Sequence, residues 1–463
     1  MSSLSPSSVT AGGAAFTLTV TGSNFVSSSV VEWNQSPRTT TWVNSTTLTI
    51  PVSAGDIAAS GSADISVDNP APGGGTSGSL SLKINSPQTS GITTVNLTAN
   101  DLAWDPVHQQ IYLSLPSADG ANGNSIQVLN PQTGTLGATA FAGSEPNLVS
   151  VSANSQYLYV SLDGASNVIQ MTLPNLAISN TIALGGDKFN GPYFAMDVQA
   201  SPVADATVAV VRGTPEYSPE EEGGVVIYDS GVPRPDVLCG WIQFGCTSST
   251  GPGLFDSIQW GANAAEIFAA NSEDTAFDFY TIPVDASGFG TVTDYPGVVP
   301  GFFGSIHYDA ATQLVYDDDG RSVDPANGTV VGTFNASGLM VPDGSLGIAY
   351  FVGQTQNQTS GSGYTIESFD LNHFTPIATL TIPNIAGVPT HLIRWGTDGL
   401  ALTTASNGNS SSSGAVYLIS GSFVTGASSS AIPAENVRRT WKRAILPPGK
   451  SGNLSRLGFS AAP

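Results

Sequence analysis

One repeat unit decides the fold of this chain: Leu102-Ala-Trp-Asp-Pro-Val-His-Gln-Gln-Ile-Tyr-Leu113, followed by Ser125-Ile-Gln-Val-Leu-Asn-Pro-Gln-Thr-Gly134. The first stretch reads as two apolar strands joined by an Asp-Pro turn, and the second as a third strand that ends in Asn-Pro and a glycine. The same order returns at Leu148-Val-Ser-Val-Ser-Ala-Asn-Ser-Gln-Tyr-Leu-Tyr-Val160 and Asn167-Val-Ile-Gln-Met-Thr-Leu-Pro174. The chain therefore contains a repeated group of short strands.

Weaker copies follow these two clear ones. Seven copies begin near Leu102, Leu148, Phe194, Ser257, Ser305, Leu339 and Leu392. Their mean spacing is about 48 residues, within the ~40–50 residues that are typical of four-stranded propeller blades. We therefore predict an all-β chain with a seven-bladed β-propeller over residues 88–430, in which radial closure leaves few exposed strand edges.

A closed ring of blades needs a strand that joins its two ends. The strand-like stretch Thr93-Thr-Val-Asn-Leu97 precedes the first blade, and no comparable stretch follows Ile419. We therefore predict that residues 92–98 supply the outer strand of the last blade and so close the ring.

The region before the propeller has a different pattern. Phe16-Thr-Leu-Thr-Val-Thr21 alternates apolar and hydroxyl side chains, which is typical of a half-buried strand. Further short strands are expected at Val30–Trp33, Thr46–Ile50, Asp64–Val67 and Leu80–Ile84, with turn residues between them. This spacing predicts an immunoglobulin-like β-sandwich over residues 1–87.

Four stretches of this region carry a family resemblance: Ser5-Pro-Ser-Ser-Val-Thr-Ala-Gly-Gly13, Phe16-Thr-Leu-Thr-Val-Thr-Gly-Ser-Asn-Phe25, Val31-Glu-Trp-Asn34 and Val67-Asp-Asn-Pro-Ala-Pro-Gly-Gly74. With them the region resembles the IPT/TIG domain. In that family most such modules are spacers or binding units of surface and secreted proteins, and a spacer is what the resemblance implies here.

The propeller region carries a second resemblance, in Trp104-Asp-Pro-Val-His-Gln-Gln-Ile-Tyr112, Asn130-Pro-Gln-Thr-Gly134 and Val323-Asp-Pro-Ala-Asn-Gly328. It looks like the YVTN-type and NHL-like propellers of bacterial exported proteins, although the tetrapeptide Tyr-Val-Thr-Asn is absent. The resemblance implies a bacterial exported protein.

The composition limits the class of partner. The 463 residues include 13 Lys and Arg against 35 Asp and Glu, which gives a net charge of −22. So acidic a chain is not expected to bind nucleic acid, because phosphate recognition depends on basic side chains. No apolar run approaches the ~20 residues of a membrane-spanning helix. The few basic groups also suggest a protein adapted to acidic surroundings, in which carboxylates lose their charge.

The cysteines and the two ends of the sequence bear on where in or outside the cell the protein is located. Cys239 and Cys246 lack the spacing of a zinc site, so we expect a local disulfide, with two buried thiols as the alternative. The opening residues Met1–Pro6 do not form a signal peptide, and we expect a truncated or processed chain that is extracellular or displayed at the cell surface. The basic residues 431–463 fall outside the blade pattern and are expected to form a poorly ordered tail.

A candidate ligand site follows from the propeller geometry. The innermost strand of each blade begins at the rim of a central channel, so polar residues at these starts are expected to converge there. The predicted rim residues are Asp101, Asn147, Tyr193, Asp256, Ser305 and His391, with His307 and Arg394 slightly deeper.

Two kinds of chemistry are conceivable at this rim. Asp101, Asn147 and Asp256 offer oxygen ligands of the kind Ca²⁺ prefers, as in metal-dependent lactonase propellers, although no cofactor is required by the sequence. His307 and His391 either pair as an acid and a base or are structural, and we favour the structural role. The run Asp317-Asp-Asp-Gly320 lacks calcium-loop spacing and is interpreted as a solvated turn at the end of a strand.

These observations favour a binding protein over an enzyme. We expect an extracellular or surface-displayed monomer whose propeller face binds a glycan, a small molecule or a protein, with the immunoglobulin-like domain as a spacer. The alternative is a lactonase-like hydrolase or a lyase that uses the rim carboxylates and a metal.

Overall fold

The fold was analysed in a computed structural model. It describes residues 1–6, 8–11, 15–59, 61–72, 74–85, 90–188, 191–214, 221–238, 255–272, 276–302, 304–354, 363–383, 385–405 and 414–426. The predicted disulfide partners Cys239 and Cys246, and the predicted tail over residues 431–463, lie outside these residues. The regular structure of the described part is β, apart from two short helices, η1 (Ser117–Asn122) and α1 (Ser422–Thr425).

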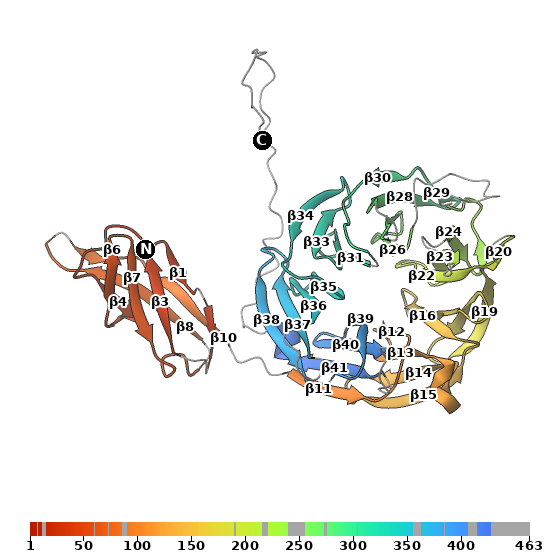
Figure 1. Ribbon diagram of the computed structural model, residues 1–463, viewed down its shortest axis with the longest axis horizontal. Coiled ribbons are helices and arrows are strands. Elements are labelled where there is room, and N and C mark those ends of the chain that lie inside the picture. The colour runs from red at the N-terminus through yellow and green to blue at the C-terminus, as the bar shows by residue number, and fades with distance from the viewer. Residues whose placement is uncertain are drawn as a thin grey trace, which may run out of the picture. The chain divides into compact units, whose positions relative to one another are not determined.

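The N-terminal region forms a sandwich of two sheets (Figure 1). One sheet has the order β1 (Ser3–Ser5), β3 (Phe16–Thr21), β7 (Thr47–Val52) and β6 (Thr41–Asn44). The other has the order β2 (Ser8–Thr10), β10 (Leu80–Asn85), β8 (Gly61–Asn69), β4 (Val30–Trp33) and β5 (Ser36–Pro37), with β9 (Gly75–Thr76) paired to β8. Strands β2 and β10 are parallel, and the other pairs are antiparallel.

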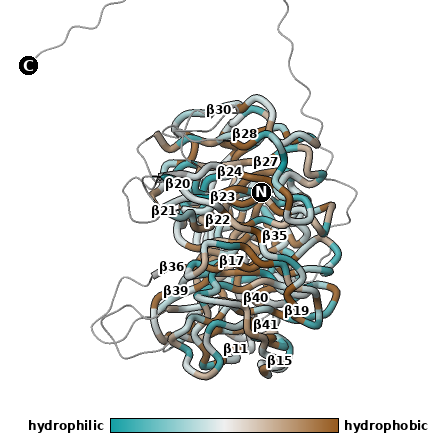
Figure 2. Tube along the Cα trace, turned by 90° about the vertical axis from the view of Figure 1, so that its right-hand side faces the viewer, coloured by the Kyte–Doolittle hydropathy of each residue, from teal (hydrophilic) through white to brown (hydrophobic). Residues whose placement is uncertain are grey.

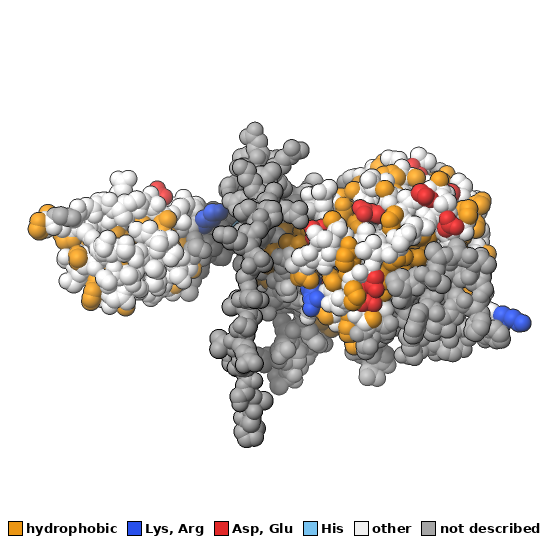
Figure 3. All heavy atoms as spheres, turned by 90° about the horizontal axis from the view of Figure 1, so that it is seen from above, with side chains coloured by type: hydrophobic (Ala, Val, Ile, Leu, Met, Phe, Trp, Pro, Cys, Tyr) orange, Lys and Arg blue, Asp and Glu red, His pale blue; other side chains and the backbone are white. Residues whose placement is uncertain are grey.

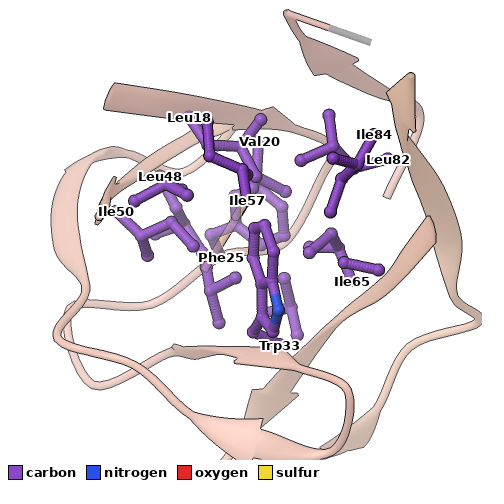
Figure 4. Close-up of a cluster of buried hydrophobic side chains, with 14 of the residues drawn as sticks. Leu18, Val20, Phe25, Trp33, Leu48, Ile50, Ile57, Ile65, Leu82 and Ile84 are labelled. Atoms are coloured by element: carbon purple, nitrogen blue, oxygen red, sulfur yellow. The ribbon is translucent and has the colours of Figure 1, made fainter. Parts of the chain in front are cut away.

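The alternation of the sequence explains how the sandwich packs. In β3 the apolar side chains of Leu18 and Val20 are fully buried, and the threonines between them are more exposed. Leu18 and Val20 meet Trp33, Leu48 and other apolar side chains from both sheets in one hydrophobic core (Figure 4). Burial of these side chains is the main source of stability for the sandwich.

The rest of the described chain forms seven sheets of four or five strands, which we number as blades 1 to 7, and one two-stranded sheet. Blade 1 contains β12 (Asp101–Asp105), β13 (Gln110–Leu115), β14 (Ser125–Asn130) and β15 (Thr135–Phe141). Blade 2 contains β16 (Pro146–Val151), β17 (Tyr157–Leu162), β18 (Asn167–Thr172) and β19 (Ala177–Ala183), and it is followed by the hairpin of β20 (Gly186–Asp187) and β21 (Gly191–Pro192). Blade 3 contains β22 (Phe194–Ala200), β23 (Thr207–Thr214), β24 (Glu221–Asp229) and β25 (Val232–Pro233).

Blades 4 to 6 follow the same antiparallel plan. Blade 4 contains β26 (Ser257–Trp260), β27 (Glu266–Ala270), β28 (Phe279–Asp285), β29 (Gly288–Phe289) and β30 (Thr293–Tyr295). Blade 5 contains β31 (Ile306–Asp309), β32 (Leu314–Asp317), β33 (Arg321–Asp324) and β34 (Thr329–Thr333). Blade 6 contains β35 (Met340–Asp343), β36 (Ile348–Gln354), β37 (Tyr364–Asp370) and β38 (Pro376–Ile382).

Blade 7 confirms the predicted closure of the ring. It contains β39 (Val388–Trp395), β40 (Gly399–Ala405) and β41 (Val416–Gly421), and its outer strand is β11 (Ser90–Val95) from the beginning of the propeller region. Strand β11 pairs with β41 from Ser90 opposite Gly421 to Val95 opposite Val416. The paired residues begin and end slightly earlier than the predicted range 92–98.

The seven blades stand around a common axis (Figure 1). The first strand of each blade is innermost and contacts the first strand of the next, and β39 contacts β12, which closes the ring. A separate hydrophobic core fills each of the seven junctions between neighbouring blades. Hydrophobic segments accordingly run through the strands, and hydrophilic segments lie in the loops (Figure 2). The described helices include none with the length and apolar character of a membrane span.

Candidate functional site

The face of the propeller at which the innermost strands begin is called the rim below. Asp101 is the first residue of β12, and Asn147 is the second residue of β16. Since neighbouring strands of a blade are antiparallel, the second strand of each blade ends at this same face. The rim therefore collects two sets of residues: those that begin the first strands and those that follow the second strands.

Asp101 connects blade 1 with both of its neighbours. Its Oδ1 accepts a hydrogen bond from the backbone N–H of Leu102 at 2.7 Å, and its Oδ2 accepts one from Val149 in blade 2 at 2.8 Å. On the other side, Nε2 of His391 in blade 7 lies 3.7 Å from Oδ1. Both carboxylate oxygens of Asp101 are thus already used within the ring.

Similar side-chain links span the other blade junctions. Innermost strands of neighbouring blades do not form a sheet with one another, so a backbone N–H that faces the next blade needs a side-chain acceptor. Such acceptors are Ser150 Oγ for Ala200 (blades 2 and 3), Asp197 Oδ2 for Ile258 (3 and 4), Ser257 Oγ for Ile306 (4 and 5) and Asp318 Oδ1 for Met340 (5 and 6). An ion pair between Asp343 and Arg394 joins blades 6 and 7.

Three other predicted rim residues are also engaged in local structure. Asn147 Nδ2 donates to Asp163 Oδ2 at 2.8 Å, within blade 2. Asp256 Oδ2 accepts from the backbone N–H and the hydroxyl of Ser272, which follows the second strand of blade 4. The ring of Tyr193 lies 5.3 Å from the guanidinium of Arg212, a cation–π contact.

Each of the two rim histidines lies against an aspartate. His307 Nε2 lies 3.0 Å from Asp318 Oδ1, and the backbone N–H of Ser305 donates to Asp318 Oδ2 at 3.0 Å. His391 lies against Asp101, as described above. Asp318 therefore gathers Ser305, His307 and Met340 at one corner of the rim, whereas sequence reasoning had interpreted it as part of a solvated turn.

Arg394, predicted to lie slightly deeper than the rim, lies near the far end of its strand. It is the penultimate residue of β39, and because a strand rises about 3.3 Å per residue, three residues beyond His391 place it about 10 Å further along the strand. There it forms the ion pair with Asp343 at 2.8 Å, donates to the carbonyl oxygens of Gly399 and Thr397, and lies over the ring of Tyr350. Its role is to join two blades at the end of their innermost strands.

The fit of a calcium ion was tested on the three residues proposed for it. Asp101 accepts two backbone hydrogen bonds, Asn147 uses its amide on Asp163, and Asp256 holds Ser272. Within the described ranges, no group of three or more His, Cys, Asp or Glu side chains is placed to hold a metal ion. These three side chains therefore hold hydrogen bonds within the ring, and calcium binding by them stays a prediction that a calcium titration would test.

Several rim carboxyl groups are withdrawn from water. Burial raises the pKa of Asp197 to about 6 and that of Asp317 to about 7, and it also raises the pKa of Asp163. The neighbouring charge of Asp101 contributes in the same direction at Asp197. Figure 3 shows acidic side chains spread over the visible side of the propeller, with few basic ones between them.

A cavity opens beside the Asp318 corner, on blade 5. Its volume is about 560 Å³, and its lining comes from three segments. Pro300 precedes blade 5, Asp319 and Arg321 flank the turn between β32 and β33, and residues 333–337 connect β34 of blade 5 with β35 of blade 6. The depression is wide open to solvent, and its volume lies in the range of roughly 300–1,000 Å³ that small-molecule sites have.

Sequence reasoning missed Asp163, Asp197, Asp318, Asp319 and Arg321. It placed only the starts of the first strands at the rim, so Asp163, which follows a second strand, was left out and Asp318 was interpreted as part of a solvated turn. The antiparallel order of each blade is a signal that would have found them. Asp197 lies within a first strand, where a carboxylate between apolar residues was a further signal.

Comparisons with known proteins agree with this architecture. Residues 1–84 match the family model of the IPT/TIG domain. The β-propeller domain of Cps50 (Swd1) from Myceliophteria thermophila is a similar solved structure, with a TM-score of 0.52 and 12% sequence identity; the match covers 72% of this chain and 99% of that one. At this identity the likeness shows the fold alone. Comparison with curated proteins finds no match.

Proposed function

We propose that this protein is an extracellular or surface-displayed binding protein whose propeller presents a ligand site at the rim. The observation that carries the proposal is the cavity on blade 5. It lies on the face where the first strands begin, and its lining includes a carboxylate, a guanidinium and an amide from Asp319, Arg321 and Asn335. A concave site with a few converging polar groups is the usual form of a ligand pocket.

The contrast with the rest of the rim supports this choice of site. Asp101 and Asp318 accept backbone hydrogen bonds from the neighbouring blades, so their main effect is on the ring itself. Asn335, by contrast, is exposed at the cavity and belongs to a connection between two blades. Loops that a rigid scaffold holds in place are common positions for binding residues.

The setting of the site is also part of the proposal. The IPT/TIG domain would act as a spacer, and the motifs around Trp104 and Asn130 favour a bacterial propeller of the YVTN or NHL-like type. The scarcity of charged residues, 10% of the chain, suits a surface made of Ser, Thr, Gly and Asn outside the cell. A glycan, a small molecule or a protein segment is the proposed ligand, bound by a monomer.

A binding screen with a blocking variant tests this function. The full chain is screened against glycans, small molecules and peptides, and each hit is measured again with Asn335→Trp, which fills the mouth of the cavity. The matched control is Asn372→Trp, because Asn372 is also exposed but lies in the turn after β37, on the opposite face of the propeller. We expect binding that is lost in Asn335→Trp and kept in Asn372→Trp.

Two results would contradict the proposal. One is a screen in which no ligand depends on Asn335. The other is calcium-dependent turnover of a lactone or an ester that disappears in Asp256→Ala, since this would make the protein a hydrolase that uses its rim carboxylates.

A further inference from the structure

The cavity on blade 5 is held in shape by the turn that supplies its polar groups. Gly320 has a φ of +84°, and a Cβ there would collide with the carbonyl oxygen of Ala336. The backbone N–H of Phe334 donates to the carbonyl of Gly320 at 2.7 Å, and that of Gly338 donates to Asp318 at 2.8 Å. The connection between blades 5 and 6 is therefore fixed onto the turn of Asp318 to Arg321.

The same turn also fixes the opposite wall. Arg321 Nη1 donates to the carbonyl oxygens of Val298 at 2.7 Å and Gly297 at 3.3 Å. The backbone of Gly301 lies so close to the carboxylate of Asp319 that a Cβ would collide with it. Both walls are thus positioned before any ligand arrives, which lowers the entropic cost of binding.

The charges of the lining balance each other. Asp319 provides a carboxylate and Arg321 a guanidinium, and no ion pair joins Arg321 to any carboxylate in the part of the chain that the structure describes. Thr333, Asn335 and Ser337 add two hydroxyl groups and an amide, and all three residues are exposed. Such a set both donates and accepts hydrogen bonds without preferring either sign of charge.

An exposed aromatic pair follows directly on the wall formed by Pro300 and Gly301. The side chain of Phe302 is 54% exposed, and its ring centroid lies 4.8 Å from that of Phe277 in an edge-to-face arrangement. Phe277 itself has a positive φ of 53°, which is uncommon for a bulky residue and places it in this contact. Phe302 therefore places an exposed aromatic ring two residues after Pro300 of the lining.

We propose that this cavity binds a neutral carbohydrate, an inference that rests on the binding function proposed above. Sugar hydroxyl groups donate to a carboxylate such as Asp319 and accept from a guanidinium such as Arg321. The C–H face of a sugar ring packs on aromatic side chains, and the exposed ring of Phe302 follows the lining residue Pro300 closely in the chain. An anionic ligand is disfavoured by the net charge of −22.

Titration of neutral mono- and oligosaccharides into the full chain tests the inference. Asp319→Asn removes the charged acceptor and is expected to weaken binding about tenfold or more. Burial and the neighbouring Asp318 raise the pKa of Asp319, so an uncharged amide at this position is compatible with folding. Phe302→Ala is expected to weaken binding about three- to tenfold. The control is Phe141→Ala, which removes an equally prominent exposed ring at the end of β15 in blade 1.

The outcomes separate this inference from the proposed function. Neutral sugars that bind to the wild type and to Phe141→Ala, but more weakly to Asp319→Asn and Phe302→Ala, support it. If charged small molecules or peptides bind in an Asn335-dependent manner and neutral sugars do not, the carbohydrate inference fails and the binding function stands. If no ligand depends on Asn335, both fail.

Discussion

The rim around the propeller axis and the cavity on blade 5 are built from similar polar residues and use them differently. At the rim, Asp101, Asp197 and Asp318 accept backbone hydrogen bonds from the next blade. In the cavity, Asp319 and Arg321 line an open space of about 560 Å³. Convergence of polar side chains on an axis is therefore a poor guide to a binding site unless the hydrogen bonds of those side chains are followed to their partners.

The comparison predicts that rim variants change stability and that cavity variants change binding. The largest effect concerns the ring closure on which both regions depend. Deletion of residues 88–98 removes β11 together with Val95 and Leu97, which belong to the core between blades 7 and 1. We expect the free energy of unfolding of the whole propeller to fall by at least several kcal/mol, because each buried side chain of this kind contributes about 1.5–3 kcal/mol.

Scanning calorimetry of the full chain measures this effect. The sandwich has a core of its own, so its unfolding transition serves as the internal control. A propeller transition that keeps its midpoint and its enthalpy after the deletion would refute the closing role of β11.

The second prediction concerns Asp317, the buried last residue of β32. Burial raises its pKa from 3.8 to about 7 in the folded protein. A carboxyl group with a raised pKa contributes stability that is fully present below about pH 3.8 and is lost as the pH rises to about 7. At about 1.4 kcal/mol per pKa unit, the free energy of unfolding should fall by a few kcal/mol across this pH range.

Asp317→Asn should remove this pH dependence. We expect the variant to gain stability relative to the wild type between pH 4 and pH 7, measured by urea unfolding at each pH. A difference between the two proteins that does not change with pH would show that Asp317 ionises as it does in water.

The third and smallest effect tests one blade junction. Asp197→Ala leaves the backbone N–H of Ile258 without its 2.8 Å acceptor, which is expected to cost about 1–3 kcal/mol. The measurement is made at pH 5, because burial raises the pKa of Asp197 to about 6 and the group is then largely uncharged.

Two matched variants serve as controls for Asp197→Ala. Asp197→Asn keeps an acceptor oxygen and should retain most of the stability, and Asp294→Ala removes an exposed carboxylate on β30 and should change little. Equal losses in Asp197→Ala and Asp197→Asn would show that the link between blades 3 and 4 does not depend on this hydrogen bond.

Much of the fold could be predicted because its signals are local. The turn residues Asp105 and Asn130 accept hydrogen bonds from backbone N–H groups two and three residues later, so the sequence itself indicates where strands end. The number of blades follows from the repetition of such turns. The closing strand could be predicted because one strand, before the first blade, belongs to none of the repeats. In these respects the structure confirms the predicted architecture.

The site was harder to predict because its contacts join residues distant in sequence. Asp101 binds the N–H of Val149, 48 residues away, and nothing in the sequence near Asp101 indicates this partner. The run Asp317–Asp319 was interpreted as a solvated turn, yet Asp317 is 2% exposed and Asp319 lines the cavity. Three adjacent carboxylates have different surroundings because each one points towards a different neighbouring segment.

The central claim is that the rim carboxylates Asp101, Asp197 and Asp318 stabilise the ring and that the cavity on blade 5 binds the ligand. The most direct test uses a sugar that the wild-type protein binds. Its affinity for Asp319→Asn and for Asp197→Ala is measured by calorimetric titration, and the melting temperature of each variant is measured as well. We predict that Asp319→Asn loses affinity at an unchanged melting temperature and that Asp197→Ala melts earlier at an unchanged affinity. The reverse result, in which Asp197→Ala abolishes binding and Asp319→Asn leaves it intact, would contradict the account and return the ligand site to the propeller axis.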